Sequence, residues 1–133
     1  MLTDRDTAKP RQRLVILVDS DEQSRRLCRT ALSDAGFEVI TASDAATALL
    51  VARIIKPDIV LLDIDMPTLS SLVFARDIRA DDHLRQSRLI ALTGKLISHE
   101  HHELHATGFD QILVKPADQQ RLLETVGGAL VPA

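Results

Sequence analysis

Aromatic residues are scarce in this sequence: it has three Phe and neither Trp nor Tyr among 133 residues. Proteins that bind single-stranded nucleic acid commonly stack the bases on aromatic side chains. The formal net charge is -3, so the chain as a whole does not attract phosphate backbones either. These two deficits argue against nucleic acid as a direct partner.

Cysteine and long apolar segments are scarce as well. No segment approaches the roughly 18 consecutive apolar residues of a membrane-spanning helix, and the polar residues 1–13 lack the apolar stretch of a signal peptide. The single cysteine, Cys28, falls at helical spacing with apolar residues such as Leu27 and Leu32, which indicates a reduced core residue rather than a nucleophile. We therefore expect a cytoplasmic protein with no membrane partner.

The rest of the composition is that of an ordinary globular protein, with 45% hydrophobic and 26% charged residues. A chain of this length can form one domain with a hydrophobic core but not two. We expect residues 13–131 to form that domain and the polar residues 1–12 to be a flexible tail.

Short apolar runs alternate with helical patterns five times along the chain. The runs at residues 14–18 and 59–62 contain no polar residue, which is typical of strands buried on both faces. This alternation predicts the α/β class: a single doubly wound, five-stranded parallel sheet with helices on both faces. The other strands are expected at residues 37–41, 88–92 and 110–114.

Polar and small residues mark the expected ends of the helices. Ser20 is expected to cap the first helix, with Gln23 completing a capping box. Asp118 is expected to cap the last helix, whose end should fray at Gly127 and Gly128.

Four of the five expected strands end in a residue with useful chemistry: Asp19, Asp63, Thr93 and Lys115. Any one of them alone would be explained as the end of a strand. Because the carboxyl ends of parallel strands share one edge of the sheet, we expect all four to form one site. Neighbouring carboxylates attract a hard cation such as Mg²⁺, and together with an ammonium and a hydroxyl they suit in-line phosphoryl transfer to Asp63.

Four segments around these residues resemble the receiver domain of two-component response regulators. They read VILVD at 15–19, IVLLDIDMP at 59–67, IALTG at 90–94 and VKP at 114–116, and the similarity extends over about residues 13–130. The resemblance implies a chemotaxis-regulator-like, flavodoxin-like fold with strand order 2-1-3-4-5. It also implies a signalling protein rather than an enzyme.

The resemblance further implies a role for each residue of the site. Asp63 would accept a phosphoryl group from a histidine kinase or a histidine phosphotransfer protein, with Thr93 and Lys115 acting on that group. Mg²⁺ would be bound by Asp19, Asp63 and the backbone carbonyl of Asp65. Since no output domain follows in the sequence, the signal is expected to pass through contacts with another, unidentified protein.

Three features depart from the receiver pattern. Ser20 stands where receivers usually carry a second acid, Ile112 stands where they carry Tyr or Phe, and the loop 68–71 lacks the usual glycines. The first departure should weaken Mg²⁺ binding, and the second should weaken the coupling to the output surface. An alternative therefore stays open: a degenerate receiver that binds its partner independently of phosphorylation.

A second alternative comes from the segment DIDMPT at 63–68, which resembles the Asp-x-Asp opening of haloacid-dehalogenase-type phosphatases. In those enzymes the motif normally follows the first strand of the chain. Here two predicted strands and two predicted helices precede it, which counts against a phosphatase.

A run of histidines lies on the helix expected after the fourth strand. His99, His102 and His105 follow i, i+3 spacing, and His101 and His105 follow i, i+4 spacing, so two potential metal-binding pairs are present. A solvent-exposed, His-rich helix is the simpler interpretation.

Overall fold

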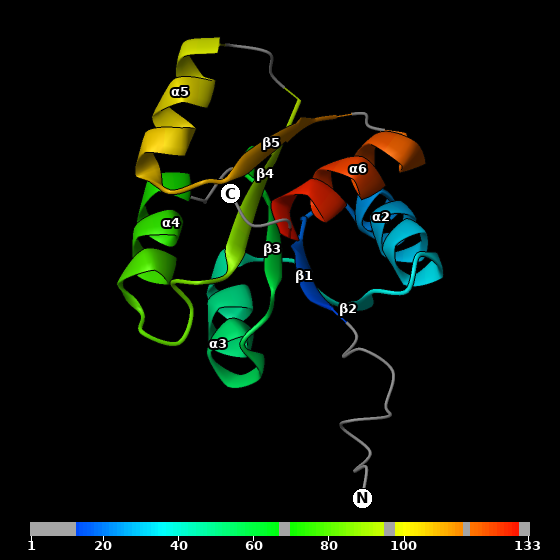
Figure 1. Ribbon diagram of the computed structural model, residues 1–133, viewed down its shortest axis with the longest axis horizontal. Coiled ribbons are helices and arrows are strands. Elements are labelled where there is room, and N and C mark those ends of the chain that lie inside the picture. The colour runs from blue at the N-terminus through cyan, green and yellow to red at the C-terminus, as the bar shows by residue number, and fades with distance from the viewer. Residues whose placement is uncertain (1–12, 67–69, 95–97, 116–117, 131–133) are drawn as a thin grey trace, which may run out of the picture.

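The computed structural model contains a five-stranded sheet between two layers of helices (Figure 1). It describes residues 13–66, 70–94, 98–115 and 118–130, apart from the side chains of residues 98–101. The strands are β1 (Leu14–Val18), β2 (Glu38–Ala42), β3 (Ile59–Asp63), β4 (Arg88–Thr93) and β5 (Gln111–Val114). The helices are α2 (Glu22–Asp34), α3 (Ala45–Ile55), α4 (Ser71–Ala80), α5 (Ser98–Thr107) and α6 (Gln119–Leu130). The predicted tail at residues 1–12 lies outside the described ranges.

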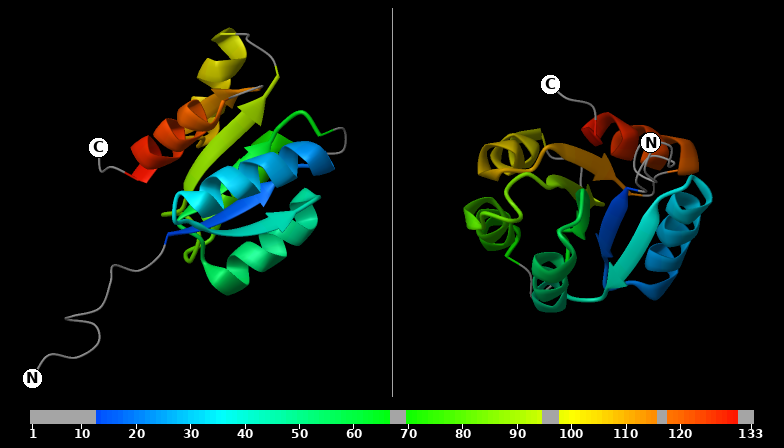
Figure 2. Two further views of the ribbon diagram at one scale, coloured as in Figure 1. Left: turned by 90° about the vertical axis from the view of Figure 1, so that its right-hand side faces the viewer. Right: turned by 60° about the horizontal axis from the view of Figure 1, so that its bottom comes forward.

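The sheet has the order β2-β1-β3-β4-β5, and every neighbouring pair of strands is parallel. The predicted fold class and strand order are therefore confirmed. All the strand arrows point the same way in the left view of Figure 2. The strand order reverses between β1 and β3, and the crevice at the carboxyl end of this pair is where doubly wound proteins bind their ligands.

The sheet separates two hydrophobic clusters. One lies between the sheet and the helices α3, α4 and α5, and the other lies between the sheet and the helices α2 and α6 (Figure 1). The alternate residues of each central strand contribute to opposite clusters, as Ile16 and Leu17 do on β1. This double burial explains why the central strands show no alternation of polar and apolar residues.

The first helix begins differently from the prediction. Asp21, not Ser20, is the N-cap of α2, and its carboxylate accepts a hydrogen bond of 2.8 Å from the backbone N–H of Ser24. The predicted capping box of Ser20 and Gln23 is therefore wrong. The reason is local: the N–H of Asp21 donates to Asp19 Oδ1 at 2.9 Å, and this turn places Asp21 at the start of the helix.

The last helix also differs from the prediction at its C-terminal end. The expected cap is confirmed, since Asp118 Oδ1 accepts the backbone N–H of Arg121 at 2.8 Å. The expected fraying at Gly127 and Gly128 is wrong, because α6 continues to Leu130. Ala129 is buried against the sheet, and this packing offsets the low helix propensity of two glycines.

The environment of Cys28 is only partly as predicted. Cys28 lies half-buried against the α2–α6 cluster, and its neighbour Leu32 is fully buried there. Burial raises the pKa of the Cys28 thiol, and the nearby Asp19 carboxylate raises it further. Leu27, by contrast, is 65% exposed.

None of the helices within the described ranges is both long enough and apolar enough to cross a membrane.

Candidate functional site

The four residues at the strand ends come together at the carboxyl edge of the sheet. Lys115 follows β5, and its Nζ lies 2.9 Å from Asp19 Oδ2 and 3.3 Å from Asp63 Oδ2. The ammonium therefore bridges carboxylates from β1 and β3, the two strands at the switch point. Thr93, the last residue of β4, is buried beside them.

Asp19 is the more firmly held of the two carboxylates. Its side chain is fully buried, and its oxygens accept hydrogen bonds from the N–H of Asp21 at 2.9 Å, from Ser24 Oγ at 2.7 Å and from Lys115. Burial alone would raise its pKa, but these hydrogen bonds outweigh that effect and hold the pKa of Asp19 below its usual value. Asp19 is therefore a fixed anion at neutral pH.

Asp63 accepts fewer hydrogen bonds than Asp19, and its pKa is shifted in the opposite direction. Its side chain is 9% exposed, and Oδ1 accepts the backbone N–H of Asp65 at 3.0 Å. Burial raises the pKa of Asp63, the neighbouring Asp19 carboxylate adds to the rise, and the contacts with Asp65 and Lys115 only partly counter it. Asp63 is therefore the more basic carboxylate of the pair.

Lys115 owes its position to the register of β5. Its backbone N–H donates to the carbonyl of Thr93 at 2.7 Å, which extends the β4–β5 pairing by one residue past the end of the strand. Burial lowers the pKa of Lys115, but the carboxylates of Asp19 and Asp63 more than offset this and raise it. The side chain is therefore a permanent cation between two acids.

The side chain of Asp65 takes part in the site in a way that the sequence reasoning missed. Its carboxylate accepts hydrogen bonds from Thr93 Oγ1 at 3.0 Å and from the backbone N–H of Gly94 at 2.7 Å. Asp65 thus holds the donors at the end of β4, while its own N–H holds Asp63. The Asp-x-Asp spacing was the available signal, since a second acid two residues after a strand end stays at the same edge.

The positions that depart from the receiver pattern lie at the margins of this cluster. Ser20 is exposed, and the following acid is engaged as the helix cap. Ile112 is half-buried on β5 and packs against the cluster under α3, α4 and α5. In the loop 68–71, residues 68 and 69 lie outside the described ranges, and Ser70 caps α4 by accepting the N–H of Val73 at 3.3 Å.

The carboxylates of the site determine its capacity to hold a metal ion. No group of three or more His, Cys, Asp or Glu side chains suited to a metal ion occurs among the described residues. Asp19 and Asp63 still present oxygens, which hard cations prefer, on either side of a bound ammonium. This donor set suits a cation that keeps several water ligands, whereas the Asp65 carboxylate is engaged by Thr93.

The histidines of α5 show no metal site in the part of the helix whose side chains are described. His102 and His105 are exposed, and His105 Nδ1 lies 3.0 Å from the carbonyl of Phe109. The side chains of His99 and His101 lie outside the described part of the chain, so their predicted pairings stay predictions.

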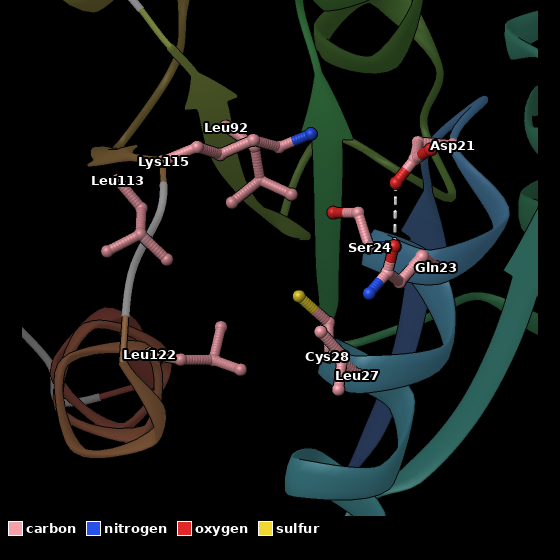
Figure 3. Close-up of a pocket in the computed structure, with 9 residues that line it drawn as sticks. All are labelled: Asp21, Gln23, Ser24, Leu27, Cys28, Leu92, Leu113, Lys115 and Leu122. Carbon is pink, nitrogen blue, oxygen red and sulfur yellow. Dashed lines mark hydrogen bonds between the residues drawn. The ribbon is translucent and has the colours of Figure 1, made fainter.

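A cavity of about 480 Å³ lies beside the cluster, between α2 and α6 (Figure 3). Leu92 and Leu113 from the sheet and Leu122 from α6 give it an apolar lining, and Lys115 reaches across its mouth. This hollow explains why Lys115 remains 27% exposed while the Asp19 side chain is not exposed at all. Sequence patterns gave no sign of it.

Comparison with known proteins identifies the family. Residues 15–127 match the model of the response regulator receiver domain. The polar-differentiation response regulator DivK of Brucella anthropi is 30% identical over 112 residues, which cover 84% of this chain and 91% of that protein. Response regulators of this type are signalling proteins.

Solved structures agree with this assignment. The chemotaxis response regulator CheY4 of Vibrio cholerae matches with a TM-score of 0.85 and 29% identity, covering 90% of this chain and 100% of that one. The receiver domain of the sensor histidine kinase PA1611 of Pseudomonas aeruginosa matches with a TM-score of 0.80 and 22% identity, covering 90% and 98%. That structure is described with a magnesium ion coordinated in its active site cleft, and its likeness to this chain supports the fold alone.

The family match spans most of the chain and leaves the phosphatase alternative without support. Its limits enclose Asp19, Asp63, Thr93 and Lys115, the residues that meet at the carboxyl edge of the sheet. The chain belongs to the response regulator receiver domain family.

Proposed function

We propose that this receiver domain accepts a phosphoryl group on Asp63 from a histidine kinase or a histidine phosphotransfer protein. The observation that carries the proposal is the position of the Lys115 ammonium, within 3.3 Å of Asp63 and 2.9 Å of Asp19. A cation fixed beside a basic carboxylate can stabilise the charge that develops when that carboxylate attacks a phosphoryl group.

The two carboxylates differ in their fitness as nucleophile. Asp19 uses its oxygens to accept three hydrogen bonds, and its pKa is lowered. Asp63 is held by one N–H and one long contact to Lys115, and its pKa is raised, so its lone pairs are more available. This contrast supports Asp63 as the acceptor and Asp19 as a fixed negative charge.

In the proposed transfer, an oxygen of Asp63 attacks the phosphorus of a phosphohistidine. A P–O bond forms, the P–N bond breaks, and the electron pair returns to the imidazole nitrogen, which takes up a proton. The product is an acyl phosphate on Asp63 and a neutral histidine on the donor. Lys115 pairs with one oxygen of the transferred group, and Thr93 donates to another after its hydroxyl leaves Asp65.

Mg²⁺ is the expected cofactor, and Asp19, Asp63 and the backbone carbonyl of Asp65 are the residues that would hold it. When bound, the ion would neutralise part of the negative charge of the phosphoryl group. Ser20 gives this site one acid fewer than receivers usually carry, so we expect weaker binding. The signal would then pass to an unidentified protein through surface contacts.

A second candidate function is phosphorylation-independent binding of a partner. It is favoured by the hydrogen bonds of the Asp65 carboxylate, which already occupies the donors of Thr93 and Gly94 that a phosphoryl oxygen would use. In that case the domain would present one surface permanently, and the cluster around Lys115 would serve stability alone.

Incubation with a small phosphodonor such as acetyl phosphate and Mg²⁺ tests the proposal. Intact-mass spectrometry should show one added phosphoryl group that is labile to hydroxylamine, and Asp63→Asn should abolish it. Asp82→Asn, which removes an exposed acid with the same change in charge, should leave uptake unchanged. A wild-type protein that stays unmodified would favour the second candidate, and undiminished uptake by Asp63→Asn would reject this acceptor.

A further inference from the structure

A second cavity, lined by charged side chains, lies at the amino edge of the sheet, opposite the cluster around Lys115. Its volume is about 290 Å³, and most of its lining is polar. It is formed by the start of β1, the turn before β3, the loop between α4 and β4, and the end of α6. Its charged and titratable lining residues are Arg13, Lys56, Asp58, His83 and Arg88.

The charge of this cavity is opposite to that of the whole chain. Arg13, Lys56 and Arg88 face a single carboxylate, Asp58, which leaves a net charge of +2 with His83 neutral. The chain as a whole carries -3. Cations gathered in a concave, polar surface concentrate the field that attracts an anion.

Within the described ranges, the cations of the cavity form only long ion pairs. Arg13 lies 3.9 Å from Asp58, whose carboxylate also accepts the N–H of Leu14 at 2.8 Å. Arg88 lies 3.7 Å from its nearest carboxylate. For Lys56, the described part of the chain provides no ion pair within 4.0 Å. Long, partly exposed ion pairs contribute little, so these groups can turn to a ligand.

Two acids near the cavity, Asp81 and Asp110, have close arginine partners outside it. Asp81 contacts Arg53 at 3.3 Å, and Asp110 contacts Arg79 at 2.9 Å as well as Arg88 at 3.7 Å. Asp82 has a long contact of 3.9 Å with Arg85, and its side chain is 88% exposed, so water screens its charge. Among the described residues, carboxylates outside the cavity therefore offset the local excess of positive charge only in part.

Lys56 provides an independent sign of a special role. Its backbone has φ 51° and ψ 71°, and it is the sole non-glycine residue with positive φ within the described ranges. It ends α3, a position where glycine is the usual residue because a side chain is strained there by roughly 1 kcal/mol. The strained backbone holds a lysine at the cavity where glycine would be less costly.

We propose that this cavity binds a compact phosphate polyanion, such as pyrophosphate or a small phosphate ester. Arginine forks and lysine ammonium groups from separate segments match an anion with several oxygens. The small volume excludes a bulky ligand. The lining has no Phe, Tyr or Trp on which a nucleobase could stack, which favours the phosphate group itself over a nucleotide base as the recognised part.

Titration of the full chain with sodium pyrophosphate tests this proposal. The measurement is two-dimensional amide NMR in a buffer without Mg²⁺, at ionic strength held constant with NaCl. Shift changes that saturate below about 1 mM and centre on residues 56–58 and 86–88 are expected. The variant Lys56→Gly removes the charge and relieves the strain, so it should fold at least as stably and bind about tenfold more weakly, the loss of one charge-assisted contact.

The matched control is Arg121→Gln, which removes one positive charge from an exposed site on α6. It should change the affinity by less than twofold. An equal loss in both variants would reduce the effect to overall charge and overturn the proposal. Shift changes centred on Asp63 instead, or none up to 10 mM, would overturn it as well. Because no phosphodonor is present, these outcomes are independent of whether Asp63 is a phosphoryl acceptor.

Discussion

Each edge of the sheet carries a cluster of charged side chains, and the two clusters have different roles. At the carboxyl edge, Lys115 lies between two carboxylates that repel each other. At the amino edge, the guanidinium of Arg79 donates to the carbonyls of Gly108, Arg85 and Ser87 and to the carboxylate of Asp110, at 2.6 to 3.1 Å. One cluster mixes repulsion with attraction, whereas the other consists of satisfied donors and acceptors.

This difference distinguishes a functional site from a purely structural set of contacts, here the hydrogen bonds of Arg79, which we call the clamp. Backbone carbonyls do not titrate, so Arg79 ties the end of α4 to the loops before β4 and β5 through fixed partners. The carboxylates around Lys115 still repel each other, because one ammonium relieves their repulsion only in part, so a further cation would be attracted to them. A charged cluster is therefore a candidate site when its members neutralise one another incompletely.

The largest expected effect is the loss of stability when the side chain of Arg79 is removed. Arg79→Ala leaves three carbonyls without their donor and should lower the free energy of unfolding by about 3 kcal/mol, near 1 kcal/mol for each lost hydrogen bond. Urea denaturation followed by circular dichroism measures this. Arg76→Ala on the exposed side of the same helix should change stability by less than about 0.5 kcal/mol. Equal effects of the two changes would show that Arg79 does not act as a clamp.

The next effect concerns the carboxyl edge. Lys115→Ala should slow phosphoryl uptake by about 100-fold, since a fixed charge of this kind is worth on the order of 3 kcal/mol in the transition state. The rate of modification by acetyl phosphate at saturating Mg²⁺ is the measurement. Lys56→Ala, which removes a lysine at the opposite edge, should leave the rate unchanged. An unchanged rate in Lys115→Ala would place that ammonium outside the reaction.

A smaller effect is expected at the position of the missing acid. Ser20→Asp adds a negative charge near Asp19 and should tighten Mg²⁺ by about 1 kcal/mol, the scale of one added charge beside a partly solvated ion. Stability should change little, because Asp21, not residue 20, caps α2. Calorimetric titration compares this variant with wild type and with Ser20→Ala. Equal Mg²⁺ affinity in all three would mean that residue 20 does not face the ion.

The smallest effect is a gain in stability. The raised pKa of Asp63 means that the folded state disfavours its charge, so the charge costs stability above that pKa, and the cost vanishes below the usual value of 3.8. Asp63→Asn should therefore raise Tm by roughly 3 °C at pH 7, the shift that about 0.5–1 kcal/mol produces, and not at pH 3.5. Scanning calorimetry at the two pH values measures this.

The control for that gain lies at the other edge. Asp110→Asn removes a carboxylate that accepts hydrogen bonds from Arg79 and from the N–H of Leu89. This change should lower Tm at pH 7, because here the charge is satisfied. A loss of stability in both variants would contradict the contrast between the edges.

Much of the fold could be predicted from the sequence because apolar residues recur with different periods in strands and in helices. The buried runs gave β1 and β3 directly, and the other strands were shifted by at most one residue, as with β2 at Glu38–Ala42. The ends of helices were less predictable. Ser20 and Asp21 are both good caps, and only the hydrogen bond from the N–H of Asp21 to Asp19 decides between them.

The residues of the site could be predicted as a group, because parallel strands carry their ends to one edge. The contacts that these residues make with one another could not be predicted. The contacts of Asp65 with Thr93 and of Lys115 with two acids depend on side-chain directions at the ends of different strands. The cavity at the amino edge was missed for the same reason, since Arg13, Lys56 and Arg88 are separate in the sequence and meet only through the turns of the fold.

The strand order also bears on how the molecule forms during synthesis. β1 pairs with β2 on one side and with β3 on the other, and β4 and β5 then follow outward. No strand has to enter between two that are already paired, so the sheet can grow in the order in which the ribosome releases it. Lys115 follows the last strand, so a nascent chain holds both acids before their shared cation arrives. The two acids can therefore gain their shared cation only after all five strands have been synthesised.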